Sequence, residues 1–153
     1  MRLREILQPE RVVPRLDVHD KPAALRALAR IFAASDARLV EEDVLRVLSE
    51  REALGSTGVG SGVAIPHGRL HGLDAMQAAI ALCPDGVGFD AVDGEPAQIF
   101  VALLAPDRHT GDHLKALARV SRLLRDASVR ERLLRAEGRE ALLAVVEEED
   151  ARH

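Results

Sequence analysis

Two long apolar runs in the middle of the chain constrain its fold more than any other feature of the sequence. They cover residues Met76–Cys83 and Gln98–Leu104, and Pro84 and Pro106 close them. Neither run shows the apolar–polar alternation of a half-exposed strand, and continuous runs of this length are typical of strands buried on both faces. Other secondary structure must therefore cover both faces of the sheet that contains them.

Helical periodicity precedes and follows these runs. Five segments are predicted to be helices from their apolar stripes and end signals: residues 20–34, 41–53, 112–126, 128–136 and 139–147. A short extended segment is expected at 63–65, because Pro66 keeps Ile65 out of the helical region. Helices before, between and after buried strands predict a three-layer α/β sandwich.

Length and hydropathy indicate one globular domain over residues 1–153. The 153 residues match the usual size of a single domain, and a hydrophobic fraction of 47% excludes disorder. The acidic segment 147–153 is expected to be a solvated tail. No apolar run approaches the roughly 18 residues of a membrane span, and the N-terminus lacks a signal-peptide core. We therefore expect a soluble cytoplasmic protein that does not insert into membranes.

Charge and composition exclude several classes of partner. The chain has 21 basic and 25 acidic residues, for a net charge of −4, whereas nucleic-acid binding requires a basic stripe. The aromatic residues are Phe32, Phe89 and Phe100, too few for base stacking. The single cysteine, Cys83, excludes a disulfide framework and a multi-cysteine zinc site, and it is expected in the core.

The glycine-rich loop at residues 55–62 is the segment richest in possible chemistry. Its glycines permit positive φ and close backbone approach, so that successive N–H groups can converge on an anion. It is not a Walker loop, because Ser61 stands where lysine is required. It is not a dinucleotide fingerprint either, since it follows a helix and enters a strand. On glycine content alone, a flexible helix-to-strand connection is the simpler interpretation.

Two histidines change that balance. His67 follows the short extended segment, at a position where open α/β sheets place ligands, and a neutral imidazole there can act as nucleophile or base. His113 heads the inward face of helix 112–126, where the positive helix end disfavours its protonation and favours a nearby anion. Taken singly, His67 is better explained as a loop histidine bonded to a neighbouring carbonyl, and a buried histidine satisfied by backbone groups is a common explanation for His113.

A metal site is a further alternative. His67 and His71 are four residues apart, as are His109 and His113, and helical metal ligands use this spacing. Proline and glycine interrupt any helix around the first pair, and Gly111 weakens the second. We therefore expect no metal and no other cofactor, with a zinc hydrolase as a minor alternative.

The combined motifs closely resemble the active-site signature of enzyme IIA domains of the bacterial phosphoenolpyruvate:sugar phosphotransferase system, fructose/mannitol type. The matching residues are Arg51-Glu52 and then Gly-Ser-Thr-Gly-Val-Gly-Ser-Gly-Val-Ala-Ile-Pro-His-Gly over 55–68. The family's downstream pattern is a strand ending in Ala-Pro, then His-Leu and a Leu/Ala-rich helix. Residues 104–106 and 112–118 match it, and the similarity runs over nearly the whole chain.

This resemblance implies a mixed β-sheet with helices on both faces and a phosphotransferase component that works through a phosphohistidine. Such a carrier takes its phosphoryl group from HPr, or from the nitrogen-branch paralogue of HPr. The Ile-Pro-His motif assigns the acceptor role to His67, through Nε2, and the other motifs assign phosphate stabilisation to His113 and Arg51. A backbone carbonyl is expected to hold the Nδ1 hydrogen. The loop is expected to add neutral donors from Ser56, Thr57, Gly58, Gly60 and Ser61.

The output of such a carrier stays open at this point. Transfer to a cysteine of enzyme IIB and phosphorylation-dependent binding of regulatory target proteins are compatible, and the phosphoryl group adds about −1.5 to −2 charges. The chain has no fused IIB or membrane IIC segment, which favours the nitrogen-regulatory type. A sugar-specific IIA of a fructose or mannitol transporter is the alternative, and a binding module without phosphorylation is a weaker one. Charge alone does not rank four possible partner contacts: Arg69, His71, Glu95 and His109.

Overall fold

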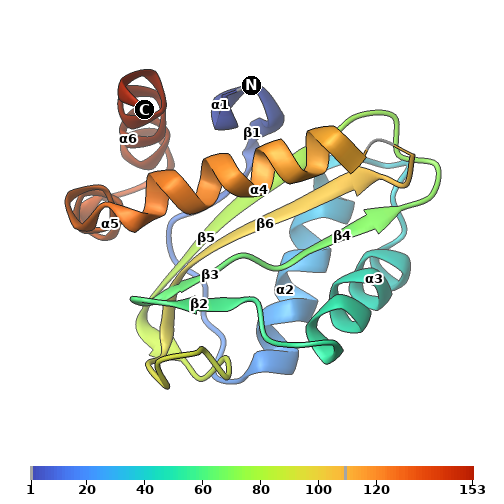
Figure 1. The fold of residues 1–153 in the computed structure, drawn as a ribbon, viewed down its shortest axis with the longest axis horizontal. Coiled ribbons are helices and arrows are strands. Elements are labelled where there is room, and N and C mark those ends of the chain that lie inside the picture. The colour runs from blue at the N-terminus through green and yellow to red at the C-terminus, as the bar shows by residue number, and fades with distance from the viewer. Residues whose placement is uncertain (1, 109) are drawn as a thin grey trace.

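The two apolar runs form the central pair of strands in a six-stranded sheet (Figure 1). In the computed structural model, which describes residues 2–108 and 110–153, they become β5 (Gln77–Val87) and β6 (Ala97–Pro106), paired antiparallel. Four further strands complete the sheet: β1 (Leu7–Val13), β2 (Gly58–Gly60), β3 (Val63–Ala64) and β4 (His67–Leu70). β1 runs parallel to β5, β3 and β4 run parallel to β6, and β2 is antiparallel to β3. The sheet is therefore mixed, as expected.

Helices cover both faces of this sheet (Figure 1). The first layer contains α2 (Lys21–Ser35) and α3 (Glu41–Ala53). The second contains α1 (Leu3–Ile6), α4 (Thr110–Arg125), α5 (Ala127–Arg135) and α6 (Arg139–Arg152). All five predicted helices are present, and the predicted three-layer α/β sandwich is confirmed. In the described part of the chain, no helix is both long and apolar enough to cross a membrane.

The side chains of β6 show why its sequence does not alternate. Val101 and Leu103 pack into the core beneath α4, α5 and α6, whereas Phe100 and Leu104 pack into the core beneath α2 and α3. Both faces of the strand are thus buried, as the apolar runs predicted. Cys83 is also buried in the second of these cores, in agreement with its expected structural role.

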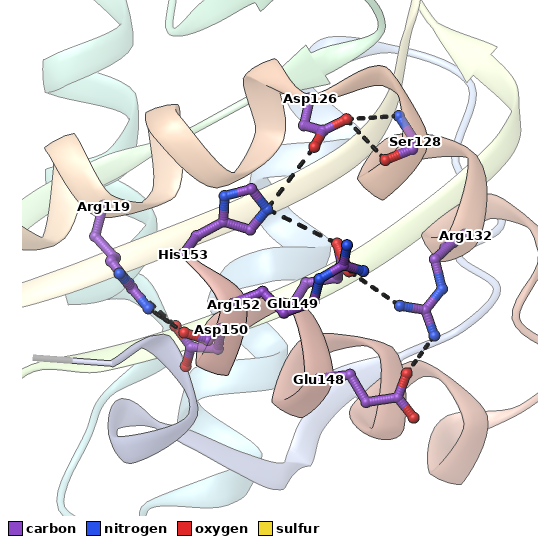
Figure 2. A network of polar contacts seen from close by, with 9 residues as sticks. All are labelled: Arg119, Asp126, Ser128, Arg132, Glu148, Glu149, Asp150, Arg152 and His153. Carbon is purple, nitrogen blue, oxygen red and sulfur yellow. Dashed lines mark hydrogen bonds and ion pairs between the residues drawn. The ribbon is translucent and has the colours of Figure 1, made fainter.

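The acidic end of the chain is not the solvated tail that the sequence suggested. α6 continues through this segment, and Glu149 and Asp150 are each only 2% exposed. The Arg119 side chain of α4 donates to Asp150, and Arg132 of α5 donates to Glu149 (Figure 2). The backbone N–H of Arg4 also donates to the Asp150 carboxylate. Partners that are distant in sequence neutralise these carboxylates, which is what allows their burial.

Candidate functional site

His67 begins β4, where the edge of the sheet lies between α3 and α4 (Figure 1). The sequence predicts His67 just beyond a short strand; instead, His67 is itself part of a strand, and its backbone pairs with Leu103 of β6. Gly68, the next residue, lies against α3, and a Cβ there would stand 3.1 Å from the Val47 side chain. Because neighbouring side chains in a strand point to opposite faces, His67 and Arg69 project to the other side, toward α4.

Two contacts fix the imidazole of His67. Its Nδ1 lies 2.7 Å from the carbonyl oxygen of Ile65, and its Nε2 lies 3.2 Å from Nε of Arg51. A carbonyl can only accept and a guanidinium can only donate, so Nδ1 carries the hydrogen and Nε2 keeps a lone pair. The expectation that a backbone carbonyl holds Nδ1 is therefore met. Arg51 is itself held by the carbonyl oxygen of Gly55, 2.9 Å from Nη1.

The surroundings of His67 favour its neutral form. Burial lowers the pKa of its imidazole, and the positive charge of Arg51 lowers it further. The Ile65 carbonyl and the Glu52 carboxylate act in the opposite direction, yet the pKa of His67 stays below its ordinary value. At neutral pH the ring is therefore uncharged, and its Nε2 lone pair is available as a nucleophile.

His113 reaches the same place from the first turn of α4. The two imidazole rings meet edge to face, with centroids 5.4 Å apart and planes at 78°. His113 is 5% exposed, and burial, followed by the charges of His67 and Arg69, lowers its pKa to about 4. Its Nδ1 is buried without a hydrogen-bond partner among the described residues. Such an unpaired atom costs about 1–3 kcal/mol and is often a sign of function.

The side chains of Arg51, His67 and His113 line one open cleft of about 640 Å³. Its rim is apolar on both sides: Leu54 follows α3 and is 85% exposed, and Leu114 of α4 is 64% exposed. The cleft is lined by Val47, Glu50, Arg51, Leu54, His67, Gly68, Arg69, His113, Leu114 and Leu117. The structure thus brings together the predicted acceptor histidine and both predicted phosphate-stabilising residues.

The glycine-rich loop is placed differently from the expectation. The amide of Thr57 donates to the Glu52 carboxylate, and the amide of Gly58 donates to Oγ of Ser56. These donors are satisfied inside the protein instead of pointing at His67. The Thr57 carbonyl accepts from the N–H of Ile65 at 2.9 Å, so this part of the loop reaches the site through the backbone.

The end of the loop faces a second hollow. Gly60 and Ser61 line a space of about 250 Å³ together with residues of α4 and α5, and neither lines the His67 cleft. The amide of Ser61 donates to the Asp93 carboxylate at 2.9 Å. Direct phosphate binding by loop residues 56–61 therefore stays a prediction to which the observed placement gives no support.

The other histidines that the structure describes, His19, His71 and His153, do not line this cleft. Within residues 2–108 and 110–153, no three His, Cys, Asp or Glu side chains form a group that could hold a metal ion. Nδ1 of His71 instead lies 2.9 Å from the Asp107 carboxylate at the surface. His109, which the sequence analysis paired with His113, lies outside the described residues.

The sequence motif includes Glu52, but the burial of this residue was not predicted and no role was assigned to it. Glu52 is buried, although it is charged and near the end of α3. It continues the buried stripe of that helix, four residues after Leu48 and eight after Val44. A carboxylate at helical spacing from the core-facing residues of a helix is the sequence signal that could have predicted its burial.

Comparison with known proteins identifies the family to which this chain belongs. Residues 5–149 match the family model described as "Phosphoenolpyruvate-dependent sugar phosphotransferase system, EIIA 2". The chain is 40% identical over 146 residues to a nitrogen regulatory protein of Bradyrhizobium diazoefficiens, covering 95% of each chain. It is 37% identical over 118 residues to a fructose-specific EIIA component of Haloferax volcanii, covering 76% of this chain and 77% of that one.

A solved structure agrees with these relatives. The crystal structure of nitrogen regulatory protein IIA-Ntr from Neisseria meningitidis matches with a TM-score of 0.87 at 35% identity, over 94% of this chain and 97% of that chain. The α/β sandwich is thus that of a phosphotransferase-system component. More particularly, the chain belongs to the EIIA 2 family of the phosphoenolpyruvate-dependent sugar phosphotransferase system.

Proposed function

We propose that this chain is a histidine phosphocarrier of the nitrogen-regulatory type. It accepts a phosphoryl group from HPr, or from the nitrogen-branch paralogue of HPr, on Nε2 of His67. It then passes the group to an enzyme IIB or uses it to control target proteins. The pair of contacts at His67 carries the proposal: Ile65 holds Nδ1, and Nε2 faces Arg51 in an open cleft. The similarity to nitrogen regulatory proteins over 95% of the chain supports the type.

The tautomer of His67 suits the transfer step. The Nε2 lone pair attacks the phosphorus of the donor's phosphohistidine, and a new N–P bond forms as the donor's N–P bond breaks. The electron pair of the broken bond returns to the donor imidazole. His67 keeps its Nδ1 hydrogen, bonded to the Ile65 carbonyl, so that no proton has to leave the acceptor ring.

Arg51 changes partner during this step. In the unphosphorylated protein its Nε donates to the nitrogen that reacts. When the phosphoryl group arrives, this guanidinium turns to the phosphoryl oxygens and stabilises their charge with charge-assisted hydrogen bonds. His113 stays neutral near physiological pH because its pKa is about 4. It therefore adds hydrogen-bonding capacity without a second full charge that would hold the group too firmly for onward transfer.

The test is phosphoryl transfer in a mixture of phosphoenolpyruvate, enzyme I and HPr or its paralogue from the same organism. Intact mass spectrometry should show one added phosphoryl group on the wild type and none on His67→Ala. His71→Ala is the matched control, because it removes an exposed histidine outside the cleft, and it should be phosphorylated like the wild type. A folded wild type that gains no phosphoryl group from either donor would refute the proposal.

Sugar transport is the second candidate, favoured by the similarity to a fructose-specific EIIA component. The same reaction mixture separates the two functions when a fructose-type enzyme IIB from the same organism is added. Transfer of the phosphoryl group to the IIB cysteine would favour transport. A phosphorylated His67 that persists beside IIB would favour the regulatory type.

A further inference from the structure

Glu52 is part of a ring of hydrogen bonds that includes both ring nitrogens of His67. We propose that Glu52 is the positioning residue of this site, which holds the glycine-rich loop and the end of α3 together so that His67 and Arg51 face each other. The inference deepens the proposed function, because it takes phosphoryl transfer to His67 as the reaction that this positioning serves. Glu52 itself lines no part of the cleft and touches no reacting atom.

The ring consists of four hydrogen-bonded steps. Both oxygens of Glu52 accept the backbone N–H of Thr57, at 2.9 and 2.8 Å. The Thr57 carbonyl accepts the N–H of Ile65 at 2.9 Å, and the Ile65 carbonyl accepts Nδ1–H of His67 at 2.7 Å. Arg51 closes the circuit at Nε2, 3.2 Å away. Because Arg51 and Glu52 are consecutive, the two ends of the imidazole are held by neighbouring residues of one helix.

The Glu52 carboxylate is built into this place. Its side chain is 4% exposed, and Nζ of Lys21 lies 3.1 Å from one of its oxygens. The hydroxyl of Thr57 donates a further hydrogen bond. Lys21 is fixed in turn, 3.2 Å from Asp90 and 4.9 Å from the ring centroid of Phe89. A buried carboxylate compensated on every side links the starts of α2 and the loop to the end of α3.

The charge of Glu52 also bears on the nucleophile. Among the described residues, the charged or titratable side chains that line the cleft or act on His67 are Glu50, Arg51, Glu52, Arg69 and His113. The positive charge of Arg51 lowers the pKa of His67, and the negative charge of Glu52 raises it. Arg51 can therefore serve the phosphoryl oxygens while Glu52 offsets its depressing effect on the basicity of Nε2. Two neighbouring residues of opposite charge thus have complementary effects on one imidazole.

The first experiment needs no phosphoryl donor. Nuclear magnetic resonance of the His67 ring nitrogens gives its tautomer and its pKa in the wild type, in Glu52→Gln and in Glu149→Gln. Glu149→Gln is the matched control, since it makes the same change at a buried, arginine-paired carboxylate on α6. We expect Glu52→Gln to lower the pKa of His67 and to weaken the preference for the Nδ1–H tautomer. The control should leave both at the wild-type value.

The second experiment measures the rate of phosphoryl transfer to His67 per folded molecule. Loss of alignment should slow Glu52→Gln by about tenfold to 10²-fold, while Glu149→Gln should transfer at the wild-type rate. Equal transfer rates and equal His67 titrations in the two variants would overturn the positioning role. A wild type that takes no phosphoryl group would refute the proposed function, yet the titration would still decide the role of Glu52.

A milder pair of variants covers the case in which Glu52→Gln does not fold. Thr57→Val removes the hydroxyl that donates to Glu52 and keeps the backbone N–H, whereas Thr57→Ser keeps both donors. We expect Thr57→Val to shift the pKa of His67 and to slow phosphoryl transfer. Thr57→Ser should keep both the pKa and the transfer rate at the wild-type value. Indistinguishable behaviour of the two variants would contradict the ring.

Discussion

The His67 cleft and the ion-pair network at the end of α6 both bury polar side chains, but they satisfy them differently. In the network, the Asp150 carboxylate accepts hydrogen bonds from Arg119, and Glu149 accepts from Arg132 and Arg152 (Figure 2). The backbone N–H of Arg4 also donates to Asp150. In the cleft, Nδ1 of His113 has no hydrogen-bond partner within the described ranges. The reactive nitrogen of His67 accepts a hydrogen bond from Nε of Arg51 at 3.2 Å, and Arg51 can give up this bond when a ligand arrives.

The difference separates groups that stabilise the fold from groups that retain capacity for a ligand. In a complete network the partners offset the desolvation cost of the buried charges, whereas in an incomplete one an unpaired polar atom carries a penalty that ligand binding can relieve. Substitutions in the network should therefore affect folding without affecting transfer, whereas removal of Arg51 from the cleft should mainly affect transfer.

The largest effect is expected from Arg119→Met. It leaves the Asp150 carboxylate buried without its arginine, which should lower the free energy of unfolding by about 3–5 kcal/mol. Urea denaturation measures the loss. Adding Asp150→Leu should recover much of it, because the uncompensated charge is then gone. If transfer to His67 per folded molecule also fell, the separation of the two regions would be wrong.

The next effect belongs to the cleft. Arg51→Ala removes the guanidinium beside Nε2 of His67 and should slow phosphoryl transfer by about 10²–10³-fold, with a small effect on unfolding. Rapid-quench measurement of the phosphorylated protein gives the rate. Arg46→Ala removes an exposed arginine of the same helix and should leave the rate unchanged. Equal rates for the two variants would show that Arg51 does not act on the phosphoryl group.

A smaller effect follows from the neutrality of His113. An unfolded histidine titrates near pH 6.5, whereas burial lowers the pKa of His113 to about 4 in the folded protein. Between these values the unfolded chain binds a proton that the folded cleft excludes, so stability falls as the pH drops through this window. The loss should reach roughly 1–3 kcal/mol. Urea denaturation at several pH values should show the full loss in the wild type and a smaller loss in His113→Gln, which keeps the contribution of His67, whose pKa is also lowered. Parallel profiles would contradict the prediction.

The smallest effect is expected at the surface. His71→Ala removes the contact between Nδ1 of His71 and the Asp107 carboxylate, in which the histidine side chain is almost fully exposed. Solvent screens such pairs, so the free energy of unfolding should change by less than about 0.5 kcal/mol. Thermal denaturation suffices to check this. A loss comparable to that of Arg119→Met would mean that burial is not what distinguishes the network.

The layers of the fold could be predicted because local patterns determine them. The continuous apolar run around Val101 requires cover on both faces, and the caps and stripes of residues 20–34 and 41–53 predict their helices. β1 was not predicted, since Arg11 interrupts its apolar pattern. That arginine is buried by donating to the carbonyls of Ala78 and Ile6, contacts that no local pattern reveals.

The candidate site was predictable to the extent that its residues stand in motifs. His67, His113 and Arg51 do meet in one cleft, and the inward face of α4 pointed to His113. The placement of the loop was not predictable, because the partners of its amides, such as the carboxylates of Glu52 and Asp93, are set by tertiary packing. The burial of Glu149 escaped prediction for the same reason, since Arg132 is 17 residues away.

The contact between Arg4 and Asp150 sets the order in which a newly made chain can mature. Its 2.8 Å hydrogen bond spans 146 positions, and α6 also packs against β1 at the edge of the sheet. Contacts of such long sequence separation form late. During synthesis, Leu3 and Leu7 therefore lack their final cover until the last helix leaves the ribosome, and the growing chain must avoid aggregation throughout that interval.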